Sequence, residues 1–249
     1  MPSEARQSLL RGARLCLSIT GRRGTDRRNT GRLLHRFRSV LGALGDWGLP
    51  GPVGVVNVSL GARIAFRALR GYRDVAALVS LVGVVNVQDT LRRVIGDDVV
   101  DQCLRGNPPD AREVLGYTIG SRFVGDAVDQ NLHSLESTKH DVAQCPFPIT
   151  HVFAEDDACT RLEEVESVFG HDGDIASRQM YILPEASHKL GYNPIAARTA
   201  FSLAVTALAR ELTGAELAVE QVISPSFNDV VEKNRQEKSM DGEVNRFTA

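Results

Sequence analysis

The stretch Val53-Gly-Val-Val-Asn-Val-Ser59-Leu-Gly61-Ala-Arg63 decides the fold of this 249-residue chain, because an apolar run stops there at a serine and a helical pattern begins. The run is rich in β-branched residues and follows the turn formers Pro50-Gly-Pro52, which predicts a buried parallel strand over 53–58. Apolar residues then recur at helical spacing over 60–70. A tight turn between two such elements exposes a side chain at the end of the sheet, so the pattern predicts a serine nucleophile and acyl-transfer chemistry.

Two interpretations of Ser59 remain open from this local pattern. A nucleophile turn usually reads G-x-S-x-G; Gly61 fits that pattern, whereas Asn57 is larger than expected. Serine is also a common helix N-cap, which would give it a purely structural role. If Ser59 is the nucleophile, the backbone N–H of Leu60 is expected to face the oxyanion that develops on attack.

Composition narrows the class of protein. Hydrophobic residues make up 43% of the chain, enough for the core of one α/β domain, and the net charge of −2 gives no reason to expect nucleic-acid binding. There is no apolar run of membrane-spanning length and no signal-peptide core, so we expect a cytoplasmic protein. The cysteines form no C-x-x-C pair and no zinc-ligand pattern, which predicts reduced thiols, no metal and no cofactor. They are Cys16, Cys103, Cys145 and Cys159.

Charge divides the chain into three parts. Residues 1–50 hold ten arginines against three acidic residues, and we expect 1–32 to be a basic, flexible arm. Two alternatives for residues 1–32 are a basic arm that contacts an acidic partner and an organelle transit peptide. Residues 33–214 form the expected core, beginning with an amphipathic helix at 33–44. Residues 215–249 form a charged C-terminal tail.

Within the core, a second apolar run at 75–87 completes a β-α-β unit. The pentapeptide Gly-Val-Val-Asn-Val occurs at 54–58 and again at 83–87, which we interpret as two adjacent parallel strands. Residues 88–145 are polar and helical with no strand-like run, as expected of a cap inserted into the core. Further strands are expected at 149–154 and 178–183, and a last helix from about 194 to 212.

Two loops at predicted strand ends supply the partners that a serine nucleophile needs. Asp157 follows one strand and His188 the next, and ligands bind at the carboxyl ends of strands in open α/β sheets. The chain order Ser59, Asp157, His188 is that of α/β-hydrolases, so we predict that fold: a mostly parallel sheet flanked by helices, with a helical cap. His188 would act as general base, and Asp157 would orient its ring and stabilise the imidazolium.

The acidic member of this group has competitors. Glu155 and Asp156 precede Asp157, which we choose because it lies three residues after the small Ala154 at the strand end. The carboxylates could instead cap the following helix, and His188 could be a solvated loop residue. His151, inside a predicted strand, is interpreted as structural.

Five motifs of the chain occur in the order found in one protein family. They are Ser59-Leu-Gly-Ala-Arg63, Val82-Gly-Val-Val-Asn-Val-Gln-Asp-Thr-Leu91, Glu155-Asp-Asp157 with Leu162-Glu-Glu-Val165, Ala186-Ser-His-Lys-Leu-Gly191 and Ser224-Pro-Ser-Phe-Asn228. These motifs resemble the acyl transferase, an acyl-carrier-protein thioesterase, of bacterial bioluminescence. The resemblance runs from about residue 53 to about 235 and implies that Ser59 takes a long acyl chain, typically myristoyl, from acyl-carrier protein or coenzyme A. It also implies that Asp157 and His188 complete the triad and that the released fatty acid passes to fatty-acid reductase subunits.

The amino-terminal part departs from this resemblance. The family has several strands before the nucleophile turn, one of which leads to a second oxyanion N–H. Only 52 residues precede the strand at 53–58 here, and 15–19 is the single strand-like run among them. We therefore expect a member shortened at its amino terminus, with an unassigned second donor. A general carboxylesterase of the same fold, or an inactive remnant that binds a ligand or partner, are the alternative functions.

Overall fold

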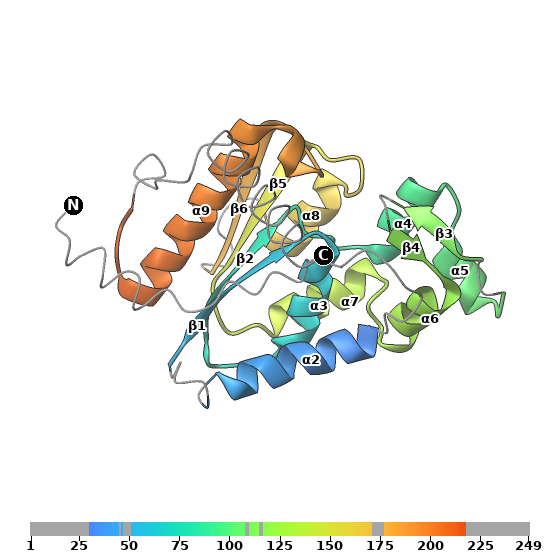
Figure 1. Ribbon diagram of the computed structural model, residues 1–249, viewed down its shortest axis with the longest axis horizontal. Coiled ribbons are helices and arrows are strands. Elements are labelled where there is room, and N and C mark those ends of the chain that lie inside the picture. The colour runs from blue at the N-terminus through green and yellow to red at the C-terminus, as the bar shows by residue number, and fades with distance from the viewer. Residues whose placement is uncertain are drawn as a thin grey trace, which may run out of the picture.

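The computed structural model describes residues 30–44, 46, 51–107, 110–114, 117–170 and 177–217. A sheet of parallel strands forms the centre of the molecule, with helices packed on both faces (Figure 1). Residues 1–29, which hold most of the expected basic arm and the strand candidate at 15–19, lie outside the described residues. Nearly all of the expected charged tail lies outside them too.

The central sheet has four parallel strands in the order β1-β2-β5-β6. The strands β1, β2 and β5 are mostly apolar and buried because helices cover both faces of the sheet, whereas β6, at the edge of the sheet, has many exposed residues. Parallel neighbours need a crossover connection, and a helix after the serine turn supplies the one between β1 and β2. The strands are β1 (Val53–Val58), β2 (Val75–Leu81), β5 (Ile149–Asp156) and β6 (Arg178–Ser187).

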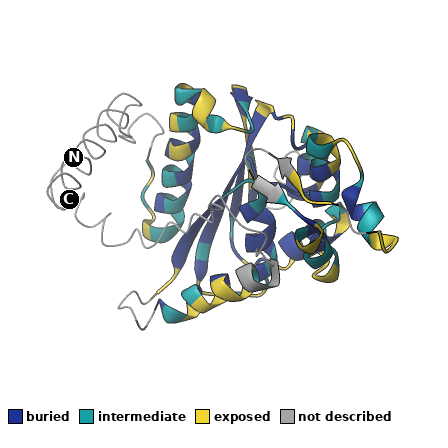
Figure 2. Cartoon of the chain, turned by 45° about the vertical axis from the view of Figure 1, so that its right-hand side comes forward, coloured by how far each residue is buried: buried dark blue, intermediate teal, exposed yellow. Residues whose placement is uncertain are grey.

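The helices divide between the two faces of the sheet (Figures 1 and 2). On one face, α9 packs through a stripe of alanines against the alternate apolar residues of the strands. On the other face, larger side chains including Phe37, Phe66 and Phe169 fill the core. Within the described residues, no helix combines the length and apolarity that a membrane crossing requires. The flanking helices are α9 (Pro194–Thr213) and, on the opposite face, α2 (Thr30–Ala43), α3 (Leu60–Ala68), α7 (Leu135–Ala143) and α8 (Leu162–Phe169).

The segment between β2 and β5 forms a lobe at one side of the sheet (Figure 1). Its small core includes Val87, Val99, Val100 and Val124. The expectation of no strand in this segment is wrong, because two short strands pair antiparallel there. Three-residue strands are too short to show alternating hydrophobicity in the sequence. The elements are α4 (Val87–Ile95), α5 (Val99–Leu104), β3 (Arg112–Val114), β4 (Tyr117–Ile119) and α6 (Ser121–Asp129), followed by α7.

The second copy of the repeated pentapeptide is not a strand, which corrects our interpretation of the repeat. The strand β2 ends at Leu81, and the chain then forms a loop that reaches α4. Asn86 caps that helix by accepting a hydrogen bond from the backbone N–H of Asp89 at 3.2 Å. The same five residues therefore serve as a strand in one place and as a loop and helix start in another.

A buried arginine joins α3 to the chain around α7. The Arg63 side chain is fully buried, and its Nη1 donates to Asp141 Oδ2 at 2.7 Å. Its Nε donates to the Leu132 carbonyl at 3.0 Å, while Nη2 donates to the Asn131 carbonyl at 3.1 Å and to Ser137 Oγ at 3.0 Å. These bonds satisfy a charge that would otherwise be costly to bury, and they fix α3 relative to residues 131–141.

The loop after β2 requires glycine at position 83. A Cβ added there would lie 2.1 Å from Ser80 Oγ and 2.7 Å from the Ala62 Cβ. We expect Gly83→Ala to lower the free energy of unfolding by about 1–3 kcal/mol, as overpacking does, when measured by urea denaturation. Gly125→Ala in α6 is the control, because its added Cβ would have only Cys103 Sγ nearby, at 3.9 Å. Equal stability of the two variants would contradict this account.

Candidate active site

Ser59 lies at the junction of β1 and α3 in a strained backbone conformation. Its φ is 52° and its ψ −127°, a region that non-glycine residues adopt rarely and at a cost of about 1–3 kcal/mol. Backbone hydrogen bonds hold the turn: the Ser59 N–H donates to the Leu81 carbonyl at 3.0 Å, and the Ser59 carbonyl accepts from the Val84 N–H at 3.0 Å. The Ser59 hydroxyl makes no capping bond to α3, so the N-cap alternative does not describe this side chain.

The structure brings the three predicted residues together. Ser59 Oγ lies 2.7 Å from Nε2 of His188, and Nδ1 of the same ring lies 2.8 Å from Asp157 Oδ2 and 3.1 Å from Oδ1. Ser59 follows β1, Asp157 follows β5 and His188 follows β6, so all three lie at the carboxyl edge of the sheet. The His188 side chain is 11% exposed. One hydrogen-bonded chain thus runs from a buried carboxylate to a partly exposed hydroxyl.

A tight turn holds the Asp157 carboxylate. Its Oδ1 accepts hydrogen bonds from the backbone N–H groups of Cys159 at 2.7 Å and Thr160 at 3.0 Å. Burial acts to raise the pKa of Asp157, but the hydrogen bond from His188 and these two N–H groups outweigh it, and the pKa lies below its ordinary value. Asp157 is therefore ionised at neutral pH and accepts the His188 Nδ1–H.

The two competing carboxylates lie elsewhere. Asp156 and Glu155 are both exposed, and Glu155 Oε2 accepts a hydrogen bond from the backbone N–H of Glu185 at 3.0 Å. Of the three consecutive acidic residues, Asp157 is the one whose hydrogen bond to His188 the structure shows.

Leu60 occupies the position expected of an oxyanion donor. It is the first residue of α3, where backbone N–H groups have no partner within the helix. The same helix end carries the partial positive charge of the helix dipole, which favours a developing negative charge. Among the described residues β1 is the first strand, so no earlier strand end offers a second donor there.

Beneath the serine turn lies a row of buried polar side chains. Asn57, Ser80 and His151 are register partners on neighbouring strands, and all three are fully buried. Their side-chain polar atoms have no hydrogen-bond partner within the part of the chain that the structure describes. The His151 ring stacks on Phe169 with centroids 4.6 Å apart. Burial inside a strand and stacking on Phe169 agree with a structural role for His151, and Asn57 is likewise a buried residue of the sheet.

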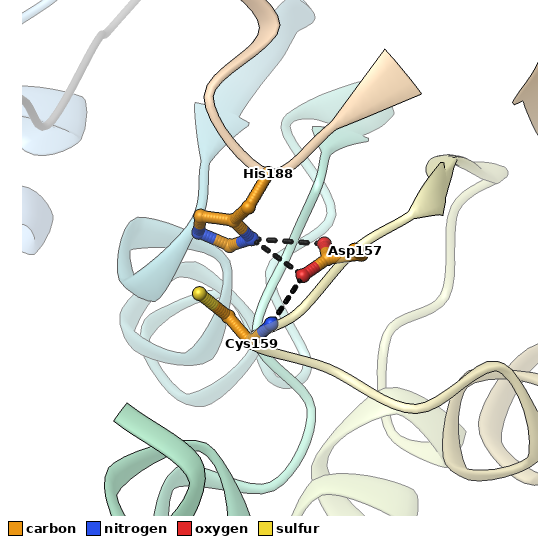
Figure 3. Close-up of side chains that lie close together, drawn as sticks. All are labelled: Asp157, Cys159 and His188. Carbon is orange, nitrogen blue, oxygen red and sulfur yellow. Dashed lines mark hydrogen bonds and ion pairs between the residues drawn. The ribbon is translucent and has the colours of Figure 1, made fainter. Parts of the chain in front are cut away.

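Cys159 lies beside the Asp157–His188 pair, and sequence reasoning missed it (Figure 3). The thiol is buried, and burial raises its pKa to about 11. Its distance from His188 in the sequence matches no zinc motif. One sequence signal could have identified it: Cys159 comes two residues after Asp157, at a strand end, where a turn can fold back on the carboxylate.

The parallel sheet, its flanking helices and the strand-end position of Ser59 define an α/β-hydrolase fold. Est1E from Butyrivibrio proteoclasticus, in a structure with ferulic acid bound, superposes with a TM-score of 0.55 at 15% identity, covering 76% of this chain and 71% of that one. Monoacylglycerol lipase from Paleococcus ferrophilus superposes with a TM-score of 0.54 at 10% identity, covering 71% of this chain and 74% of that one. These likenesses confirm the predicted fold.

Within that fold, the chain belongs to the acyl transferase family, whose family model matches residues 40–246. The acyl transferase of Vibrio campbellii is 30% identical over 196 residues, which cover 77% of this chain and 62% of that protein. The chain thus spans less than two thirds of that relative. The family resemblance inferred from the sequence motifs is confirmed.

The buried state of His151 makes stability depend on pH. Burial lowers its pKa from 6.5 to about 3, so between these values the unfolded chain binds a proton that the folded chain does not. The contribution of neutral His151 to the free energy of unfolding is therefore fully present above the pKa of the unfolded state. It is lost as the pH falls below that value, by up to about 1.4 kcal/mol per pH unit. From about pH 6.5 to about pH 5, the free energy of unfolding, measured by urea denaturation, should fall by about 1.6 kcal/mol less in His151→Phe than in the wild type. Equal losses would show that His151 is not buried in its neutral form.

Proposed function

We propose that this protein is a serine acyltransferase or thioesterase that takes a long, myristoyl-like acyl chain from acyl-carrier protein or acyl-CoA onto Ser59 and releases it as free fatty acid. The observation that carries the proposal is the hydrogen-bonded chain from Ser59 Oγ through His188 to Asp157. Membership of the acyl transferase family supports the same reaction class.

In the first half of the reaction, His188 Nε2 accepts the proton of Ser59 Oγ as that oxygen attacks the thioester carbonyl. The ionised Asp157 stabilises the resulting imidazolium through Nδ1–H. The carbonyl oxygen becomes an oxyanion, which the Leu60 N–H would bind. The intermediate collapses when the C–S bond breaks, and His188 returns the proton to the departing thiolate.

In the second half, water replaces the thiol. His188 takes a proton from the water as its oxygen attacks the acyl-serine carbonyl, and the oxyanion forms a second time. Collapse breaks the bond to Ser59 Oγ, which recovers its proton from His188. The products are the free fatty acid and the original enzyme, and another acceptor nucleophile could replace water in the same geometry.

Two exposed apolar side chains follow His188 closely in the sequence. Tyr192, in the short helix η1 (Leu190–Tyr192), and Ile195, at the start of α9, are 76% and 77% exposed. Large apolar side chains that are this exposed suit contact with a hydrocarbon chain.

The motif resemblance extends the proposal to the fate of the released fatty acid. The released fatty acid would reach fatty-acid reductase subunits and supply aldehyde for bioluminescence, in the cytoplasm. Free thiols at Cys103, Cys145 and Cys159 agree with a reducing compartment. A general carboxylesterase and an inactive remnant are the outcomes against which the proposal is tested.

Intact-mass spectrometry after incubation with myristoyl-CoA tests the acyl-enzyme directly. We expect a mass increase of one acyl group in the wild type and none in Ser59→Ala, with thioester hydrolysis falling by on the order of 10⁶. Hydrolysis of short nitrophenyl esters alone, with no reaction of long thioesters, would indicate the carboxylesterase. A folded protein with neither adduct nor hydrolysis would indicate the remnant.

A pair of neighbouring carboxylates tests the assignment of the acid. Asp157→Asn should lower kcat by about 10⁴, because the amide cannot stabilise the imidazolium and favours the wrong ring tautomer. The control is Asp156→Asn, which removes an exposed carboxylate and should keep near wild-type kcat. A larger loss in the control would assign the role to Asp156, and similar losses in both variants would contradict the assignment to Asp157 alone.

A further inference from the structure

Three side chains of kinds that bind metals meet beside Ser59. Asp157, Cys159 and His188 each offer one ligand atom, and these atoms all lie within 4.8 Å of one another. Figure 3 shows the Cys159 thiol near the His188 ring, on the side of the carboxylate turn. Asp157 and Cys159 are buried, and the His188 side chain is only 11% exposed. The three groups therefore form a compact, largely dry cluster.

The backbone holds Cys159 in this place. The Cys159 N–H donates to Asp157 Oδ1 at 2.7 Å, and the Asp157 N–H donates to the Ala154 carbonyl at 3.0 Å. The turn thus wraps around the carboxylate through backbone groups. Within the described residues, Cys159 is a free thiol, so its sulfur is available as a ligand.

We propose that Asp157, Cys159 and His188 form a binding site for a thiophilic divalent ion, zinc or cadmium, whose occupancy switches off the serine. Thiolate sulfur, imidazole nitrogen and carboxylate oxygen are the usual protein ligands of zinc, and three of them leave one position for water. Tetrahedral coordination requires ligand atoms roughly 3–4 Å apart, so the longest distance in the cluster must shorten by roughly 1–2 Å when the ion binds.

Binding changes the protons of the site in a defined way. Cys159 Sγ–H gives its proton to solvent as the sulfur–metal bond forms. The ion takes the place of the proton on His188 Nδ1, and the neutral ring then carries its one proton on Nε2. An Nε2–H donates to Ser59 Oγ instead of accepting its proton, so the serine loses its base. Metal binding does not depend on the proposed function; only the resulting loss of activity rests on it.

Cadmium titration of the full-length protein tests the site without any substrate. A cadmium–thiolate bond gives charge-transfer absorption in the ultraviolet, and we expect a band that saturates at one equivalent and disappears with a chelator. The band should be absent from Cys159→Ser and retained in Cys103→Ser, a matched change of another thiol. Ser59→Ala should also retain it, because the hydroxyl is not a ligand. A band retained in Cys159→Ser, or none in the wild type, would overturn the site.

Zinc inhibition tests the consequence. At a free zinc concentration ten times the dissociation constant, thioester hydrolysis by the wild type should fall about elevenfold, because one molecule in eleven keeps its base. The ratio of the rates with and without zinc, taken within each variant, should be close to one for Cys159→Ser. An equal zinc effect in both proteins would mean that the thiol is not a ligand. An inactive wild type that still shows the cadmium band would disprove the proposed function but retain the site.

Discussion

The backbone conformation of Ser59 is the constraint on which the site depends. A residue with φ of 52° turns the chain from β1 into α3 within one peptide unit, and it can do so only because neighbouring backbone groups hold it. Two of those groups, the Leu81 carbonyl and the Val84 N–H, belong to the end of β2 and the loop that follows. The adjacent strand thus supports the nucleophile turn as much as β1 does. The loop after β2 in turn requires Gly83. Close packing at Gly83 therefore helps to hold the strained backbone of Ser59 in place.

The sequence was sufficient to predict the parallel sheet and the three residues that meet at its edge, because strand ends and chain order are local and linear properties. The sequence was insufficient where the conformation of a segment depends on its contacts with distant parts of the chain. Gly-Val-Val-Asn-Val at 83–87 has the composition of a strand, yet Asn86 caps a helix and the chain leaves the sheet after Leu81. The pair β3 and β4 escaped notice because three-residue strands carry no period. The buried row of Asn57, Ser80 and His151 arises from the register of three strands far apart in the sequence, which no local pattern encodes.

Asp157 links the catalytic proposal to the metal proposal. Burial acts to raise the pKa of this carboxyl group, but the hydrogen bond from His188 and the two N–H groups that the turn offers to Oδ1 hold the pKa below its ordinary value. In the proposed acyl transfer, a negative charge held in this way would stabilise the imidazolium. In the proposed metal site, the same charge would attract a divalent cation beside the Cys159 thiol. The two proposals therefore rest on the same carboxylate and the same turn.

The hydrogen bonds of Arg63 have a consequence for motion. Its guanidinium uses Nε, Nη1 and Nη2 at once, on groups drawn from residues 131–141. If that segment moved relative to α3, the fully buried Arg63 side chain would lose several hydrogen-bond partners at once. Such a movement would therefore cost a large free energy. These bonds therefore oppose movement of α3 relative to residues 131–141. Under the proposed function, an opening that admits a long acyl chain would have to come from parts of the molecule that Arg63 does not contact, such as the exposed residues Tyr192 and Ile195.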